Sequence, residues 1–178
     1  MFAFAEGSFR GLRIIGIDPG IAIAGFGIVE RKADRVKAVQ YGSIETPAGA
    51  SPGERLRMIH EAVCGLIDRY GPREMAVEKL FFNRNVTTAF SVGQARGVIM
   101  LAAVQKGLVI EEYTPMQIKQ AVAGYGKAEK RQVQEMVRLL LGLPDIPKPD
   151  DAADALALAI CHAHAGTLNG KLKELYRP

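Results

Sequence analysis

The segment 12–17 is almost entirely apolar and ends in Asp18-Pro-Gly. A continuous apolar run of this length is typical of a strand buried on both faces, and Pro-Gly then predicts a tight turn. Residues 23–30 and 35–45 predict two further strands, joined by a short polar turn at 32–34. We therefore expect the fold to begin with three antiparallel strands.

A helix is predicted next, because Ser51-Pro-Gly-Glu has the form of an N-terminal capping box with proline in the first turn. Apolar residues then recur at helical spacing as far as Tyr70, where Gly-Pro ends the pattern. Residues 74–77 predict a short strand that delivers Glu78 at its end. Residues 87–105 predict a long buried helix.

The second half of the chain predicts one more strand and three helices. The strand covers 109–113, and a second capping pattern at Thr114 begins a helix that carries Lys119. Further helices are expected from about Glu129 and from about Asp150. The order of elements predicts an α/β fold, in which a mixed five-stranded sheet with three antiparallel strands and later parallel strands is flanked by helices.

The chain length of 178 residues fits a single domain with a full core. We expect residues 12–166 to form it, with residues 1–11 as a disordered extension and 167–178 as a polar tail. No stretch approaches the roughly 18 apolar residues needed to span a bilayer, so we expect no membrane partner. The cysteines Cys64 and Cys161 lack disulfide or metal-ligand spacing. The cytoplasm is the expected compartment.

Carboxylates stand at the ends of several otherwise apolar segments: Asp18, Glu78, Asp151 and Asp154. A fold that brought these ends together would gather up to four negative charges. Buried charge is costly unless it takes up a proton, pairs with an ion or coordinates a metal. Because carboxylate oxygens are the ligands that hard divalent cations prefer, the pattern favours a metal site.

Each acid also has a simpler interpretation. Asp18 before Pro-Gly is a common turn former, and Lys79 can pair with Glu78. Asp151 lies in a predicted first helical turn, where the helix dipole favours an acid. Asp154 has the weakest alternative, because it is the only charge within an apolar Ala and Leu run and needs a partner there.

Two other kinds of site find no support. His162 and His164 are two residues apart, about 200° around a helix, so they do not face one zinc ion. The glycines near Asp18 lack the Gly-Lys-Ser/Thr or Gly-x-Gly-x-x-Gly pattern of phosphate loops, so no nucleotide cofactor is expected.

The formal net charge is +4, and basic residues gather between Lys119 and Arg138. Arg84 and Arg96 flank another polar stretch. Gln94 and Arg96 are expected to support either the acidic site or a dimer contact, and the sequence leaves both alternatives open. This distribution favours a polyanionic partner, although a solvated helix face has the same composition.

Several blocks stand out along the chain: GIDPG with the following GFG, VEKLFF, GQARG, AEK before QVQEMVRLLLGLP, and DAADALALAICHAH. Together they resemble the RuvC family of bacterial Holliday-junction resolvases. The resemblance extends from about Ile14 to His164 in the family's order. It implies a ribonuclease H-like fold and an endonuclease that cuts four-way DNA junctions in recombination and repair, leaving 5′ phosphates.

The resemblance also implies roles for individual residues. The four acids match the family's catalytic, metal-binding positions, which would hold two Mg²⁺ ions per subunit, with Mn²⁺ as an alternative. Residues implied to contact DNA are Lys119, Lys130, Phe81, Phe82 and Arg84, while a solvated face or a hydrophobic contact remains the alternative for them. Implied partners are a second copy in a homodimer and the branch-migration proteins RuvA and RuvB.

Two other functions fit the same sequence features. One is a ribonuclease H-like nuclease that cuts RNA in RNA–DNA hybrids. The other is a non-catalytic junction-binding protein with structural acids.

Overall fold

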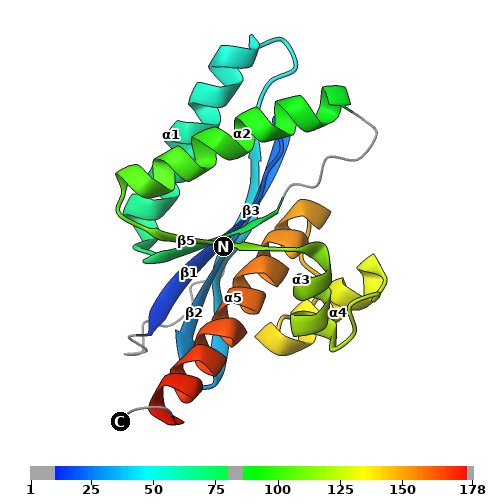
Figure 1. Ribbon diagram of the computed structural model, residues 1–178. Helices are drawn as coiled ribbons and strands as arrows, with labels where there is room; N and C mark the ends of the chain where they lie inside the picture. The colour runs from blue at the N-terminus through cyan, green and yellow to red at the C-terminus, as the bar shows by residue number, and fades with distance from the viewer. Residues whose placement is uncertain (1–10, 80–85, 176–178) are drawn as a thin grey trace.

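A five-stranded mixed sheet forms the centre of the protein, with helices on both of its faces (Figure 1). The computed structural model describes residues 11–79 and 86–175. In chain order the elements are β1 (Leu12–Asp18), β2 (Ile23–Lys32), β3 (Arg35–Glu45), α1 (Pro52–Tyr70), β4 (Glu74–Glu78), α2 (Val86–Gln105), β5 (Val109–Tyr113), α3 (Pro115–Ala123), α4 (Lys130–Leu141) and α5 (Asp150–Leu175).

The strand order across the sheet is β3-β2-β1-β4-β5. The first three strands pair antiparallel, and β4 and β5 add in parallel to β1 and to each other. Parallel neighbours need long crossovers, which α1 and α2 provide. The predicted α/β architecture is confirmed.

Helix ends follow the predicted capping residues. Ser51 and Thr114 both form complete capping boxes with the residue three positions later. The helix α5 continues to Leu175, so most of the segment 167–178 that was expected as a polar tail is helical. Within the described ranges, no helix combines the length and the apolar character needed to cross a membrane.

Two apolar cores lie on opposite faces of the sheet. On one face α1 and α2 cover inward-facing strand residues such as Ile15 and Ile17, which are fully buried. On the other face α3, α4 and α5 cover Ile14, which is also fully buried. Figure 1 shows α1 and α2 on one side of the sheet, and α5 running along the other beside α3 and α4.

Glycines let α5 approach the strands very closely. Gly16 and Gly27 are direct neighbours in the β1–β2 ladder. A Cβ at Gly16 would collide with the backbone of Ala155, and one at Gly25 would collide with the carbonyl of Asp151. Because only glycine leaves this space free, these positions seat the first turns of α5 on the sheet.

This close packing predicts that Gly16→Ala is destabilising. The added methyl group must displace backbone rather than a flexible side chain, so we expect a loss of about 1–3 kcal/mol in the free energy of unfolding, as is usual for overpacking. Urea-induced unfolding measures the change.

The matched control is Gly65→Ala in the exposed part of α1, where no atom lies within 4 Å of the new Cβ. Helix propensity predicts a gain of up to about 1 kcal/mol for this variant. Equal stabilities of the two variants would contradict the close-packing argument.

Candidate active site

The Asp18 and Glu78 side chains lie on the same face of the sheet. Asp18 follows Gly16 by two residues and Glu78 follows Ala76 by two, and Gly16 and Ala76 are paired in the parallel ladder. Side chains alternate along a strand, so both carboxylates lie on the face of Ala76, which packs in the core beneath α5. Both also end their strands, so they occupy one edge of the sheet.

The start of α5 adds the other two acids. The backbone carbonyl of Asp151 lies against Gly25, and Gly25 is the ladder partner of Asp18. Asp154 follows on the same helical face, since residues three apart are neighbours on a helix. The structure therefore brings Asp151 and Asp154 to the strand ends that carry the other two predicted acids.

The acids act on one another electrostatically, as expected for neighbouring carboxylates. Burial raises the pKa of Asp18 from its usual 3.8 to about 7, with further contributions from the charges of Asp154, Glu78 and Asp151. Burial also raises the pKa of Glu78, followed by the charge of Asp154. The cluster thus holds more negative charge than its surroundings neutralise.

Two lysines supply part of the missing positive charge. The Lys130 ammonium lies 2.9 Å from the Asp154 carboxylate and 3.4 Å from that of Asp150. Its hydrogen bond with Asp154 is the main reason that the pKa of Lys130 is raised. Lys119 on α3 acts on Glu78 and lowers its pKa, although burial and Asp154 outweigh it. Both predicted DNA-contacting lysines therefore lie beside the acids.

Among the residues that the structure describes, no three Asp, Glu, His or Cys side chains converge closely enough to enclose a metal ion. Lys130 pairs with Asp154 instead, and like charges repel one another in the absence of a cation. The donor set still fits a hard divalent ion, because every acid offers carboxylate oxygens, and a bound cation would offset both the burial and the repulsion that raise the pKa of Asp18.

Three predicted DNA-contacting residues cannot be placed. Phe81, Phe82 and Arg84 lie outside the described residues. Their roles stay predictions.

Arg96, whose role the sequence left open, contacts both Glu78 and Glu112. Its Nε donates to the backbone carbonyl of Glu78 at 3.3 Å, and its Nη2 lies 2.6 Å from the Glu112 carboxylate. The signal was present in the sequence, since Arg96 is the only charged residue in α2. Asp154 carries the same signal, since it is also a single charge within an apolar helical segment.

His162 forms a second polar contact that the sequence did not reveal. Its Nε2 lies 2.6 Å from Glu74, and its Nδ1 lies 2.7 Å from the Tyr113 hydroxyl. A neutral imidazole satisfies both partners by donating to the carboxylate and accepting from the phenol. Burial raises the pKa of Tyr113 above its usual value of 10, so the protonated phenol is favoured further as the donor to the His162 Nδ1. The network ties α5 to β4 and β5 within the layer that holds the acids.

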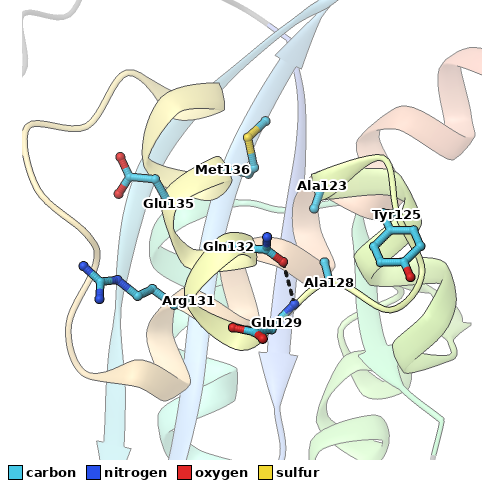
Figure 2. Close-up of a pocket in the computed structure, with 8 residues that line it drawn as sticks. All are labelled: Ala123, Tyr125, Ala128, Glu129, Arg131, Gln132, Glu135 and Met136. Atoms are coloured by element: carbon cyan, nitrogen blue, oxygen red, sulfur yellow. Dashed lines mark hydrogen bonds between the residues drawn. The ribbon is translucent and has the colours of Figure 1, made fainter.

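A separate hollow of about 500 Å³ lies between the α3–α4 turn and α4 (Figure 2). Figure 2 shows Gln132 reaching back to accept from the backbone N–H of Glu129, at 2.9 Å. Other lining residues include Tyr125 and Met136, and none of the four predicted acids lines the hollow. It is therefore distinct from the acidic site.

A mixed sheet of this strand order, with carboxylates at the ends of β1 and β4 facing a helix that carries two more, is the arrangement of the ribonuclease H-like class of proteins. A family model described as crossover junction endodeoxyribonuclease RuvC matches residues 14–162. The chain belongs to this RuvC family of endodeoxyribonucleases, and the resemblance noted in the sequence is confirmed.

Individual relatives support the assignment. The crossover junction endodeoxyribonuclease RuvC of Brevibacillus brevis is 62% identical over 152 residues, which cover 85% of this chain and 92% of the relative. The structure of Thermus thermophilus RuvC in complex with Holliday junction substrate matches with a TM-score of 0.85 at 38% identity, covering 89% of this chain and 96% of that one. The yeast mitochondrial Holliday junction resolvase Ydc2 has a TM-score of 0.61 at 12% identity, covering 94% of this chain and 88% of that one, and shares the fold.

The raised pKa of Asp18 predicts pH-dependent stability in the absence of divalent metal. The folded state keeps the proton up to about pH 7, whereas the unfolded chain loses it near 3.8. The contribution of Asp18 to stability is therefore lost as pH rises through this window. Asp18→Asn cannot ionise, so this variant should melt above the wild type at about pH 8 and approach it at about pH 4.

Thermal unfolding followed by circular dichroism in the presence of a chelator measures both proteins across this range. A difference in melting temperature that does not change with pH would show that the Asp18 carboxylate is not strained by its neighbours.

Proposed function

We propose that this protein is a Holliday junction resolvase, which makes paired symmetric incisions in four-way DNA junctions during homologous recombination and repair. The observation that carries the proposal is the acidic cluster, in which α5 brings Asp151 and Asp154 to the strand-end acids Asp18 and Glu78. The similarity to Thermus thermophilus RuvC bound to Holliday junction substrate supports the choice of substrate.

We assign all four acids as catalytic metal ligands. Two Mg²⁺ ions, or Mn²⁺ in their place, are the expected occupants, because Mg²⁺ prefers oxygen ligands. Such a pair, held by these four carboxylates, would activate a water for attack on a phosphodiester and stabilise the leaving oxygen. The expected products carry 5′ phosphates and 3′ hydroxyls.

The lysines would serve the DNA rather than the metal. Acids alone repel a phosphate backbone, whereas Lys119 and Lys130 lie at the acidic cluster and offer cationic groups to the phosphates next to the scissile bond. Since Lys130 pairs with Asp154 in the structure, a phosphate would compete for the same ammonium. Arg84 would contribute another phosphate contact, and Phe81 or Phe82 would stack on an unpaired base at the branch point.

A homodimer follows from the symmetry of the substrate, because paired cuts in a junction of approximate two-fold symmetry need two active sites. The outer face of α2 supports this arrangement. Phe90, Leu101 and Val104 are exposed there, and they share one face since 11 residues make about three helical turns. Gly97 on the same face leaves open space where a Cβ would stand, which permits close helix contact.

Family similarity further suggests RuvA and RuvB as partners that move the junction. We place the protein in the cytoplasm, where these partners and chromosomal DNA meet.

The central test is Asp18→Asn. Removing the negative charge of this buried ligand should reduce cleavage of a synthetic four-way junction to background in the presence of Mg²⁺, while junction binding stays close to wild type. Gel-based cleavage with mapped incision sites and a parallel binding assay in the presence of Ca²⁺ separate the two steps. Cleavage by this variant at a near wild-type rate would contradict the metal-site assignment.

The same assay distinguishes the competing functions. Faster cleavage of an RNA–DNA hybrid than of a junction would identify a hybrid-specific nuclease. Junction binding without cleavage by the wild-type protein in Mg²⁺ or Mn²⁺ would identify a non-catalytic binding protein.

The proposed dimer predicts that Leu101→Glu yields a monomer, because a buried unpaired charge at the centre of an apolar contact is strongly unfavourable. The control is Leu139→Glu on α4, since Leu101 is 50% exposed and Leu139 is 54% exposed. Sedimentation velocity should show a dimer for the control and a monomer for Leu101→Glu. A dimer in both cases would place the interface elsewhere.

A further inference from the structure

Arg96 reaches the end of β4 from the face opposite the acids. It extends from α2, whose neighbouring residues Ala95 and Ile99 are fully buried against the sheet. The Arg96 side chain is only 17% exposed, and its guanidinium forms an ion pair with Glu112 of β5 at 2.6 Å. Tyr113 packs in the core on the α5 face, so strand alternation places Glu112 on the α2 face with Arg96.

The carbonyl that accepts from Arg96 lies where the strand ladder ends. The ladder between β1 and β4 stops at the pair Ile17 and Val77. The ladder between β4 and β5 continues for one more pair, and the N–H of Lys79 donates to Tyr113. Glu78 therefore has no ladder partner on β1. Its carbonyl instead accepts a hydrogen bond from the Nε of Arg96, at 3.3 Å.

The contact acts on the backbone of Glu78 and not on its carboxylate. The Glu78 side chain lies on the α5 face, by the same alternation that puts Ala76 in that core. The charges that shift the pKa of Glu78 come from Asp154 and Lys119, which both belong to the α5 layer.

We infer that Arg96 is a positioning residue, which fixes the peptide plane at the end of β4 and thereby the direction in which the Glu78 carboxylate leaves the strand. This inference rests on the proposed function, in which Glu78 binds metal. Groups that orient a metal ligand without touching the metal commonly change metal affinity by about 10–100-fold when they are replaced.

The shape of the arginine side chain suits the two acceptors that Arg96 contacts. A planar guanidinium presents several N–H groups in a fixed fork, so it can donate to the Glu78 carbonyl and the Glu112 carboxylate at once. A lysine ammonium in its place can keep the ion pair with Glu112, but it lacks the second, fixed donor. Arg96→Lys therefore separates positioning from simple ion pairing.

The test is Mn²⁺ binding to the free protein, measured by electron paramagnetic resonance, together with the melting temperature. Arg96→Lys should weaken Mn²⁺ binding by about tenfold or more, while its melting temperature stays close to wild type. Arg57→Lys is the matched control, because Arg57 pairs with Glu61 in an exposed contact on α1. That control should change neither property.

Glu112→Gln provides the comparison for a purely structural role. A glutamine oxygen still accepts from Arg96, so the loss of the ion pair should lower the melting temperature more than it lowers Mn²⁺ affinity. Unchanged Mn²⁺ affinity in Arg96→Lys would overturn the inference. Affinity losses in both variants that simply follow their losses of stability would overturn it as well.

Asp18→Asn distinguishes failure of this inference from failure of the proposed function. If Asp18→Asn loses Mn²⁺ binding and Arg96→Lys keeps it, only the positioning role of Arg96 is wrong. If Asp18→Asn binds Mn²⁺ as tightly as the wild type, the metal site is wrong and the role of Arg96 falls with it.

Discussion

The seating of α5 on the sheet is the contact on which the acidic site depends. Two of the four acids belong to the strands and two to the helix, so the helix position decides whether they meet. Gly16, Gly25 and Gly27 remove the side chains that would hold the helix away. The His162 contacts with Glu74 and Tyr113 add a directional constraint further along α5. The close contact of the glycine backbone with α5 sets the distance between the helix and the sheet. The polar contacts of His162 resist sliding of the helix along the sheet.

This packing creates an electrostatic cost that the protein only partly offsets. A helix so close to two strand ends places Asp151 and Asp154 beside Asp18, and the resulting repulsion adds to burial in raising the pKa of Asp18 to about 7. Lys130 relieves some of it through Asp154. A fold selected for stability alone would avoid such a cluster. Its presence is understandable if a cation and a phosphate complete the charge balance during function.

Much of this arrangement was predictable from local sequence patterns. Apolar runs, capping residues and glycine stops gave the sheet and its helices, because these signals act within a few residues of one another. Asp154 was recognisable as a charge on an apolar helix, and the same signal marks Arg96. The pairing of Lys130 with Asp154 was not predictable, because it depends on how α4 packs against α5. The polar composition after 166 did not reveal that α5 continues to Leu175, since polar residues do not by themselves stop a helix.

The two faces of the sheet have different roles that meet at Glu78. The α5 face holds the carboxylates, whereas α2 on the other face presents Leu101 and Val104 to the outside. Arg96 lies between them, since it belongs to α2 and donates to the carbonyl of Glu78. In the proposed dimer, a shift of α2 on pairing with a second copy would reach the backbone of Glu78, a proposed metal ligand, through this one hydrogen bond. The proposed dimer contact and the proposed metal site would then be mechanically connected, which would give such a dimer a physical means of coordinating its two sites.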